Sequence, residues 1–117
     1  MSIDRPVDQD RYKNNPFLRL LDCYILDAIG ELRPEHKAAL KKLEPKLRKT
    51  FHAKGSWRQI VEDRMGFLPT VAVNIEMSWA GYRESEERLG REVAADSFVR
   101  DFVAQNFPAL AENDPQS

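Results

Sequence analysis

The fold is decided by the stretch PFLRLLDCYILDAIGEL, residues 16–32. At the 100° turn per residue of an α-helix, its apolar side chains gather on one broad arc. The arc comprises Phe17, Leu18, Leu21, Tyr24, Ile25, Ala28, Ile29 and Leu32. Asn15 and Pro16 suit the cap and the first turn of such a helix. Because the arc is wider than that of an ordinary surface helix, we expect this helix to be central in the fold or to form a homodimer interface.

The same helical period continues along the chain and predicts four further helices. Their expected bounds are 34–51, 56–66, 69–89 and 93–107. Pro45 removes one helical hydrogen bond, so we expect a kink or a break near Glu44. Ser56 and Gln59 have the spacing of a capping box at the start of the third of the five helices. The pattern therefore predicts an all-α fold, a compact bundle of about five helices.

The domain organisation follows from the length of 117 residues and from where the helical period stops. Residues 15–107 are expected to form a single helical domain. Residues 1–14 are expected to be a mobile N-terminal arm and residues 108–117 a C-terminal tail, both disordered. There is no apolar run of roughly 20 residues, so we predict no membrane-spanning helix. The polar start and the single cysteine favour a cytoplasmic protein.

The charge of the chain is unevenly distributed. Residues 33–58 hold nine basic residues against two acidic ones, whereas the remainder holds nine against seventeen. The total of −1 therefore hides a segment of +7 and a remainder of −8. Such a separation indicates electrostatic steering of a partner and does not indicate a fold.

Several kinds of catalytic or cofactor chemistry find no support in the sequence. The five glycines stand singly, which excludes a phosphate-binding loop and a dinucleotide fingerprint. His36 and His52 lack a carboxylate three or four residues away, and one cysteine cannot make a thiolate zinc site. The carboxylates that remain for a magnesium or calcium site are Asp22, Asp27, Glu62 and Asp63, which we interpret as solvated or ion-paired. We therefore predict no metal and no cofactor.

The nucleophile candidate is Cys23, within the apolar helix of residues 16–32. A thiol in such surroundings has a raised pKa and behaves as a small hydrophobe. We accordingly expect a protein that is not an enzyme.

The basic segment supplies the candidate binding residues for a partner or polyanion. They are Lys37, Lys41, Lys42, Lys46, Arg48, Lys49, Lys54 and Arg58. On a helix, Lys37, Lys41 and Arg48 share one side of the solvent face, and Lys42, Lys46 and Lys49 share the other. Like charges four residues apart repel, so something should offset them: an acidic protein, a polyanion, the chain's own acidic helices or a second copy. We expect self-association together with an acidic or anionic partner docked on residues 33–58.

A nucleic-acid-binding regulator is the alternative. Residues 59–76, QIVEDRMGFLPTVAVNIE, resemble the helix-turn-helix pattern of small phage-type repressors, with Gly66 at the turn and Ile75-Glu76 closing the recognition helix. The resemblance departs from that pattern at Glu62, where a small residue is usual, and at Leu68, where a polar residue is usual. It implies DNA binding through the helix after the turn, with Trp57 beside Arg58 as a stacking element or, more simply, as part of the core.

Overall fold

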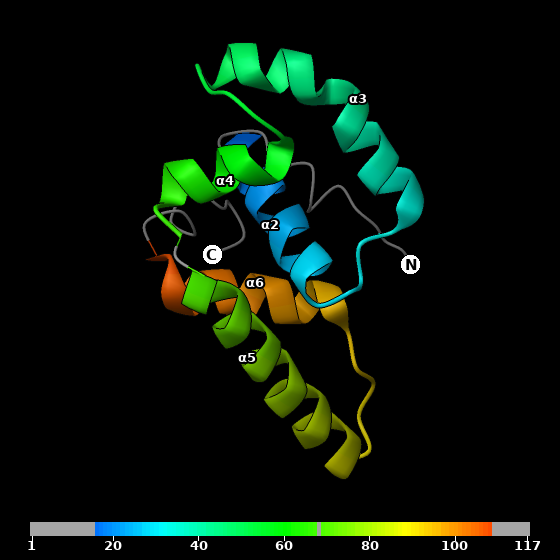
Figure 1. Cartoon of the computed structure of the whole chain (residues 1–117). Helices are drawn as coiled ribbons and strands as arrows, with labels where there is room; N and C mark the ends of the chain where they lie inside the picture. The colour runs from blue at the N-terminus through cyan, green and yellow to red at the C-terminus, as the bar shows by residue number, and fades with distance from the viewer. Residues whose placement is uncertain (1–15, 68, 109–117) are drawn as a thin grey trace.

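The computed structural model describes residues 16–67 and 69–108, and within these ranges the chain is helical and contains no strand (Figure 1). The helices are α2 (Pro16–Ala28), α3 (Pro34–Thr50), α4 (Trp57–Met65), α5 (Pro69–Arg88) and α6 (Ala95–Asn106). This confirms the all-α bundle. The predicted N-terminal arm, residues 1–14, and the predicted tail after residue 108 lie outside the described residues.

Helix α2 is the centre of the bundle, and it packs against α4, α5 and α6. Its buried residues are Phe17, Leu18, Leu20, Leu21, Asp22, Tyr24 and Ile25. Each fully buried leucine or isoleucine contributes about 1.5–3 kcal/mol relative to an exposed one. The broad apolar arc is therefore occupied by the core, which answers the question that the sequence left open. Leu20 lies outside the predicted arc, yet it is buried because helices cover α2 on several sides.

Helix α2 ends four residues earlier than the sequence pattern suggests. Gly30 has a left-handed conformation with φ of 74°. This lets the Glu31 amide donate to the Leu26 carbonyl at 2.8 Å, which closes the helix end. Leu32 is still buried, but from the connection to α3.

Helix α3 packs on α4 and runs without a break through Pro45. Figure 1 shows its axis bending along its length. Of the predicted kink or break near Glu44, the bend corresponds to the kink, and the helix is not broken. Leu40, Leu47 and Phe51 pack into the core from both sides of the proline and hold both halves of the bent helix against it.

Helix α4 begins and ends as its sequence predicts. The Ser56 hydroxyl accepts a hydrogen bond from the Gln59 amide at 3.2 Å, which is the N-cap half of the capping box. Gly66 closes the helix in the left-handed region at φ 67°. Trp57, Ile60 and Val61 form its buried face.

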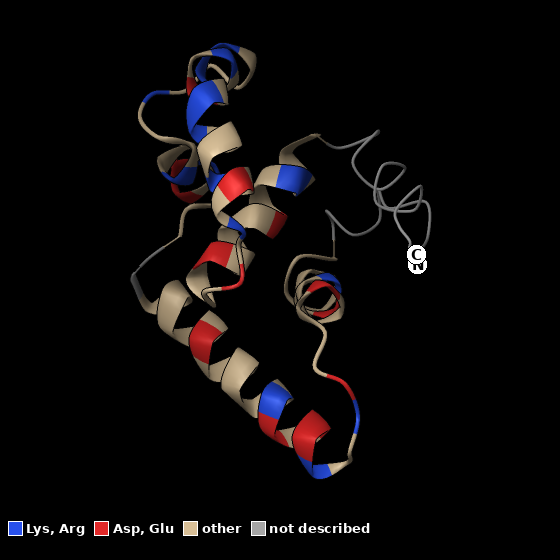
Figure 2. Cartoon of the chain, turned by 90° about the vertical axis from the view of Figure 1, so that its right-hand side faces the viewer, with Lys and Arg blue, Asp and Glu red and all other residues tan. Residues whose placement is uncertain are grey.

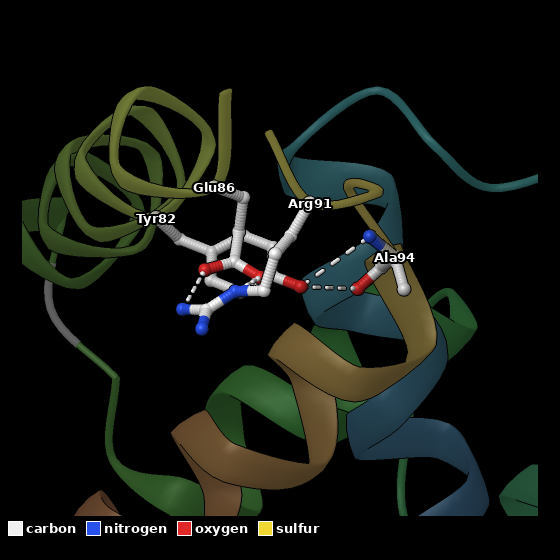
Figure 3. A network of polar contacts seen from close by, with 4 residues as sticks. All are labelled: Tyr82, Glu86, Arg91 and Ala94. Carbon is white, nitrogen blue, oxygen red and sulfur yellow. Dashed lines mark hydrogen bonds and ion pairs between the residues drawn. The ribbon is translucent and has the colours of Figure 1, made fainter. Parts of the chain in front are cut away.

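Helices α5 and α6 meet through aromatic rings and through a polar corner. The rings of Trp79 and Phe98 have centroids 5.1 Å apart. At the corner, the Tyr82 hydroxyl accepts from the Ala94 amide at 3.3 Å and donates to the Ala94 carbonyl at 3.4 Å. Beside it, Arg91 donates two hydrogen bonds to Glu86, at 3.2 and 2.8 Å (Figure 3). Because Ala94 is held there in an extended conformation, α6 begins at Ala95 and not near Val93.

Candidate functional site

The basic segment forms α3, the following loop and the first turn of α4, at one end of the molecule. Figure 2 shows Lys and Arg gathered there, while Asp and Glu are frequent along α5 and in the loop after it. The eight predicted binding residues lie in this region, but the structure divides them into two groups. Three form ion pairs with acids of the fold, and five form none with the acids that the structure describes.

Two of the three paired cations, Lys37 and Arg58, form ion pairs with Asp27 near the carboxyl end of α2. Its carboxylate lies 3.1 Å from Lys37 on α3 and 3.1 Å from Arg58 on α4, and its side chain is 12% exposed. The Arg58 guanidinium also lies over the ring of Tyr24, 5.1 Å from the centroid. Lys37 and Arg58 therefore fasten α3 and α4 to the central helix, and we assign them a structural role.

The third held cation is Arg48, which pairs with Glu44 one helical turn earlier at 4.0 Å. Arg48 also donates to the Gly55 carbonyl at 3.0 Å, and Glu44 accepts from the Trp57 amide at 3.0 Å. The two side chains thus attach the end of α3 to the start of α4, where helical amides otherwise lack acceptors. Glu44, one of the two acids in residues 33–58, therefore serves the fold.

The five remaining predicted residues are exposed lysines: Lys41, Lys42, Lys46, Lys49 and Lys54. None of them has an ion pair with a described acid. Lys42, Lys46 and Lys49 follow each other at spacings of four and three residues, so they share the face of α3 opposite the buried Leu40. We define these five residues as the lysine surface.

The end of α3 has a feature that sequence reasoning missed. His52 lies in the left-handed region at φ 50°, a conformation that non-glycine residues adopt rarely. Its amide bonds to the Lys49 carbonyl at 3.4 Å, and the Ala53 amide bonds to the Arg48 carbonyl at 2.9 Å. This is the hydrogen-bond pattern of a glycine-terminated helix with histidine in the glycine position. It turns the chain so that the loop carrying Lys54 runs back toward α4.

Sequence reasoning also missed the acids that divide the basic residues. Asp27 gave no signal beyond being a carboxylate, because its partners lie on other helices. Glu44 has the four-residue spacing to Arg48, but the hydrogen bond that it accepts from the Trp57 amide crosses a loop. Glu62 is a further case, since it accepts a hydrogen bond from the Tyr24 hydroxyl at 2.9 Å. Burial and this hydrogen bond raise the pKa of Tyr24.

The helix-turn-helix resemblance covers α4 and the first part of α5. Gly66 forms the turn, as the resemblance implies. Glu62, where the sequence departs from the helix-turn-helix pattern, accepts a hydrogen bond from Tyr24. The face that α5 turns to solvent carries Val73 and Met77, which are 53% and 68% exposed, and α5 has no Lys or Arg before Arg83. Trp57 is 4% exposed, so its ring is part of the core and is not available for stacking on a base.

Cys23 and the carboxylates of α2 and α4 are the remaining residues that the sequence considered for chemistry. Burial, with the charge of Asp22 as a smaller cause, raises the pKa of the Cys23 thiol to about 11, so it is protonated at neutral pH. Within residues 16–67 and 69–108, no three His, Cys, Asp or Glu side chains are grouped so that they could hold a metal ion. In the same ranges, no helix has the length and apolar character needed to cross a membrane.

No protein-family model, curated protein or solved structure matches this chain.

Proposed function

We propose that this protein works by association, without catalysis, and that the lysine surface docks an acidic protein partner. The observation that supports this is the division of the basic residues: the fold uses Lys37, Arg48 and Arg58, and leaves the lysine surface exposed and without an ion pair to any described acid. Like charges at these helical spacings destabilise α3 by about 0.2–0.5 kcal/mol per pair. An acidic partner converts this repulsion into attraction, and it also accelerates encounter through steering.

An acidic protein suits this surface better than a nucleic acid does. The arginines at positions 48 and 58, whose forked guanidinium groups would bind phosphate in a bidentate way, are engaged within the fold. The nearby aromatic ring of Trp57 is buried. What remains of the eight predicted residues is a set of lysines, which act as hydrated point charges and need no particular geometry in the partner. A nucleic-acid-binding regulator using residues 33–58 and 59–76 stays the alternative.

The test compares two variants that remove equal charge. Lys42→Ala with Lys46→Ala weakens the lysine surface, while Arg19→Ala with Arg88→Ala removes two exposed cations from α2 and α5. Fluorescently labelled poly-L-glutamate and a DNA duplex of equal charge serve as probes, titrated at low and moderate salt. We expect the α3 variant to bind poly-L-glutamate about tenfold more weakly and the control to stay within about twofold of wild type.

Two outcomes separate the hypotheses. Equal affinity of the α3 variant and the wild type would remove the lysine surface from the proposal. Tighter binding of the DNA duplex, with the steeper salt dependence that counterion release produces, would favour the nucleic-acid alternative. Circular dichroism of each variant establishes that the helices are retained.

Self-association is the second part of the proposal. It cannot use the apolar arc of α2, which the sequence suggested as a homodimer interface. The apolar arc of α2 is enclosed by α4, α5 and α6. The large hydrophobic side chains that remain exposed in the described chain are Leu43, Val73, Met77 and Leu89, and three of these belong to α5 or its end. A homodimer predicts a mass approaching twice 13.5 kDa as concentration rises.

A further inference from the structure

Helix α5 has one face in the bundle and one face in solvent. Ile75 and Trp79 are buried, whereas Val73 is 53% and Met77 is 68% exposed. Figure 1 shows α5 extending away from α3 and α4, so those two helices do not cover it. At helical spacing, Thr70, Val73, Met77 and Ala80 form one exposed stripe without a charge.

Two opposite charges lie along one flank of this stripe. Glu76 and Arg83 are seven residues apart, so they are on the same side of the helix, two turns from each other. Both are exposed, and neither has an ion pair within the described chain. Farther along α5, by contrast, Glu84 pairs with Arg88 at 3.3 Å and Glu86 pairs with Arg91 at 2.8 Å.

We propose that α5 is covered by α5 of a second copy of this chain, running antiparallel. In a two-helix contact of this kind, Met77 packs beside Ala80 of the second copy, and Ala80 beside its Met77, so large and small side chains alternate. The same register brings Glu76 next to Arg83 of the second copy and, by two-fold symmetry, Arg83 next to its Glu76. Two charges unpaired in each copy thus become two ion pairs.

The parallel arrangement lacks this complementarity. It would place Glu84 of one copy against Glu84 of the other, and Arg83 near the second copy's Arg88. Like charges facing each other across a helix pair are unfavourable, so the charge pattern selects the antiparallel register.

This inference rests on the self-association part of the proposed function and gives it a surface and a geometry. It is independent of the lysine surface, which is on another helix. One exposed stripe of a few turns is smaller than the roughly 800 Å² per partner of a standard interface, so the dimer is expected to be weak.

The decisive experiment is a charge swap, measured by sedimentation equilibrium from roughly 10 µM to 1 mM, the range in which small interfaces associate. Glu76→Arg alone and Arg83→Glu alone each create two repulsive contacts, and we expect both variants to lose the dimer. The double variant Glu76→Arg with Arg83→Glu recreates both pairs in reverse, and we expect it to dimerise as the wild type does. The matched control is Glu31→Arg with Arg19→Glu, which reverses two exposed charges away from α5.

Each contrary result has its own meaning. A wild type that stays at 13.5 kDa at the highest concentration would refute both self-association and this geometry. A wild-type dimer unaffected by the single reversals, or a double variant that does not recover, would refute the α5 register and leave self-association through another surface. Circular dichroism identifies any variant that loses its helices, and in that case Met77→Glu, at the exposed centre of the stripe, replaces it with the same expected loss of dimer.

Discussion

On the central helix α2, the carboxylate of Asp27 is paired within the fold, whereas the lysines on the outer surface of α3 have no ion pair with a described acid. On α2, Asp27 holds two cations from two other helices, and Tyr24 bonds to Glu62. On the outer surface of α3, lysines follow one another without a described acid in reach. Both regions are rich in ionisable side chains, so charge content alone does not identify a binding surface. The distinction lies in which charges the fold already uses.

The largest expected effect concerns the burial of Cys23 on α2 and the low reactivity of its thiol that follows. Because burial raises the pKa of Cys23 to about 11 from an ordinary value of 9.0, the folded protein keeps the thiol protonated in a range where the unfolded chain ionises. We expect alkylation by iodoacetamide at pH 8 to be about 100-fold slower in the folded protein than in urea, since the thiolate is the reactive species. The measured quantity is the rate of mass increase, corrected for the effect of urea on a free thiol.

The raised pKa of Cys23 also makes the stability of the protein depend on pH. A folded pKa above the unfolded one means that the contribution of Cys23 is fully present below pH 9 and is lost as the pH rises toward 11. Cys23→Ala removes this dependence and leaves that of Tyr24. Alkylation of the folded protein as fast as in urea would contradict the shielded position of α2.

The second prediction separates used from unused charges. Asp27→Ala leaves Lys37 and Arg58 without their partner, and we expect the free energy of unfolding to fall by about 1–2 kcal/mol. Lys42→Ala, which removes a charge without a described ion pair, should change it by no more than about 0.5 kcal/mol. Urea denaturation measures both. Equal losses in the two variants would mean that the division of charges has no energetic basis.

The third prediction concerns the end of α3. His52 occupies a left-handed position that glycine adopts without strain, so His52→Gly should stabilise the protein by about 1 kcal/mol. The matched change Lys54→Gly, two residues farther along the same loop and without a positive φ, should not stabilise it. The midpoints of thermal unfolding distinguish the two variants, and a less stable His52→Gly variant would show that the imidazole contributes more than the backbone strain removes.

The smallest expected change in stability comes from Lys46→Glu. The new carboxylate lies four residues from Lys42 and three from Lys49, so repulsion becomes attraction and stability rises by about 0.5 kcal/mol. The same change should weaken poly-L-glutamate binding. If Lys46→Glu raises stability and lowers the affinity for poly-L-glutamate, it behaves as expected of a surface whose lysines stay unpaired for a partner. If stability and affinity both rise, or both fall, the result argues against this.

Most of the fold could be predicted from the sequence because it depends on local patterns. The helical period of residues 16–32 predicted α2, and Ser56 with Gly66 predicted both ends of α4. The end of α2 was misjudged because the apolar spacing continues past Gly30, where the backbone already turns. At Pro45 the sequence predicted a kink or a break; α3 bends without breaking, and Leu40 and Phe51 on either side of the proline pack into the core.

The candidate site could be predicted only in outline. The sequence identified the eight basic residues, and the four-residue spacing of Glu44 and Arg48 is visible in it, but it contained no sign that Asp27 would hold Lys37 and Arg58. Two of these pairings join α2 to α3 and to α4, and such contacts depend on how the helices cross. The exposed apolar side chains of α5, Val73 and Met77, were likewise not predicted, because the sequence does not show which side chains of a helix its neighbours leave uncovered.

The most direct test of the central claim is a map of where an acidic chain binds. Amide chemical shifts of the ¹⁵N-labelled protein are followed during titration with poly-L-glutamate. We predict that the shifts concentrate in residues 41–54, around the lysine surface, while the amides of α2 and α5 stay in place. Shifts spread evenly over all exposed basic residues, or none at all, would contradict the claim that α3 presents the charges which the fold leaves unused.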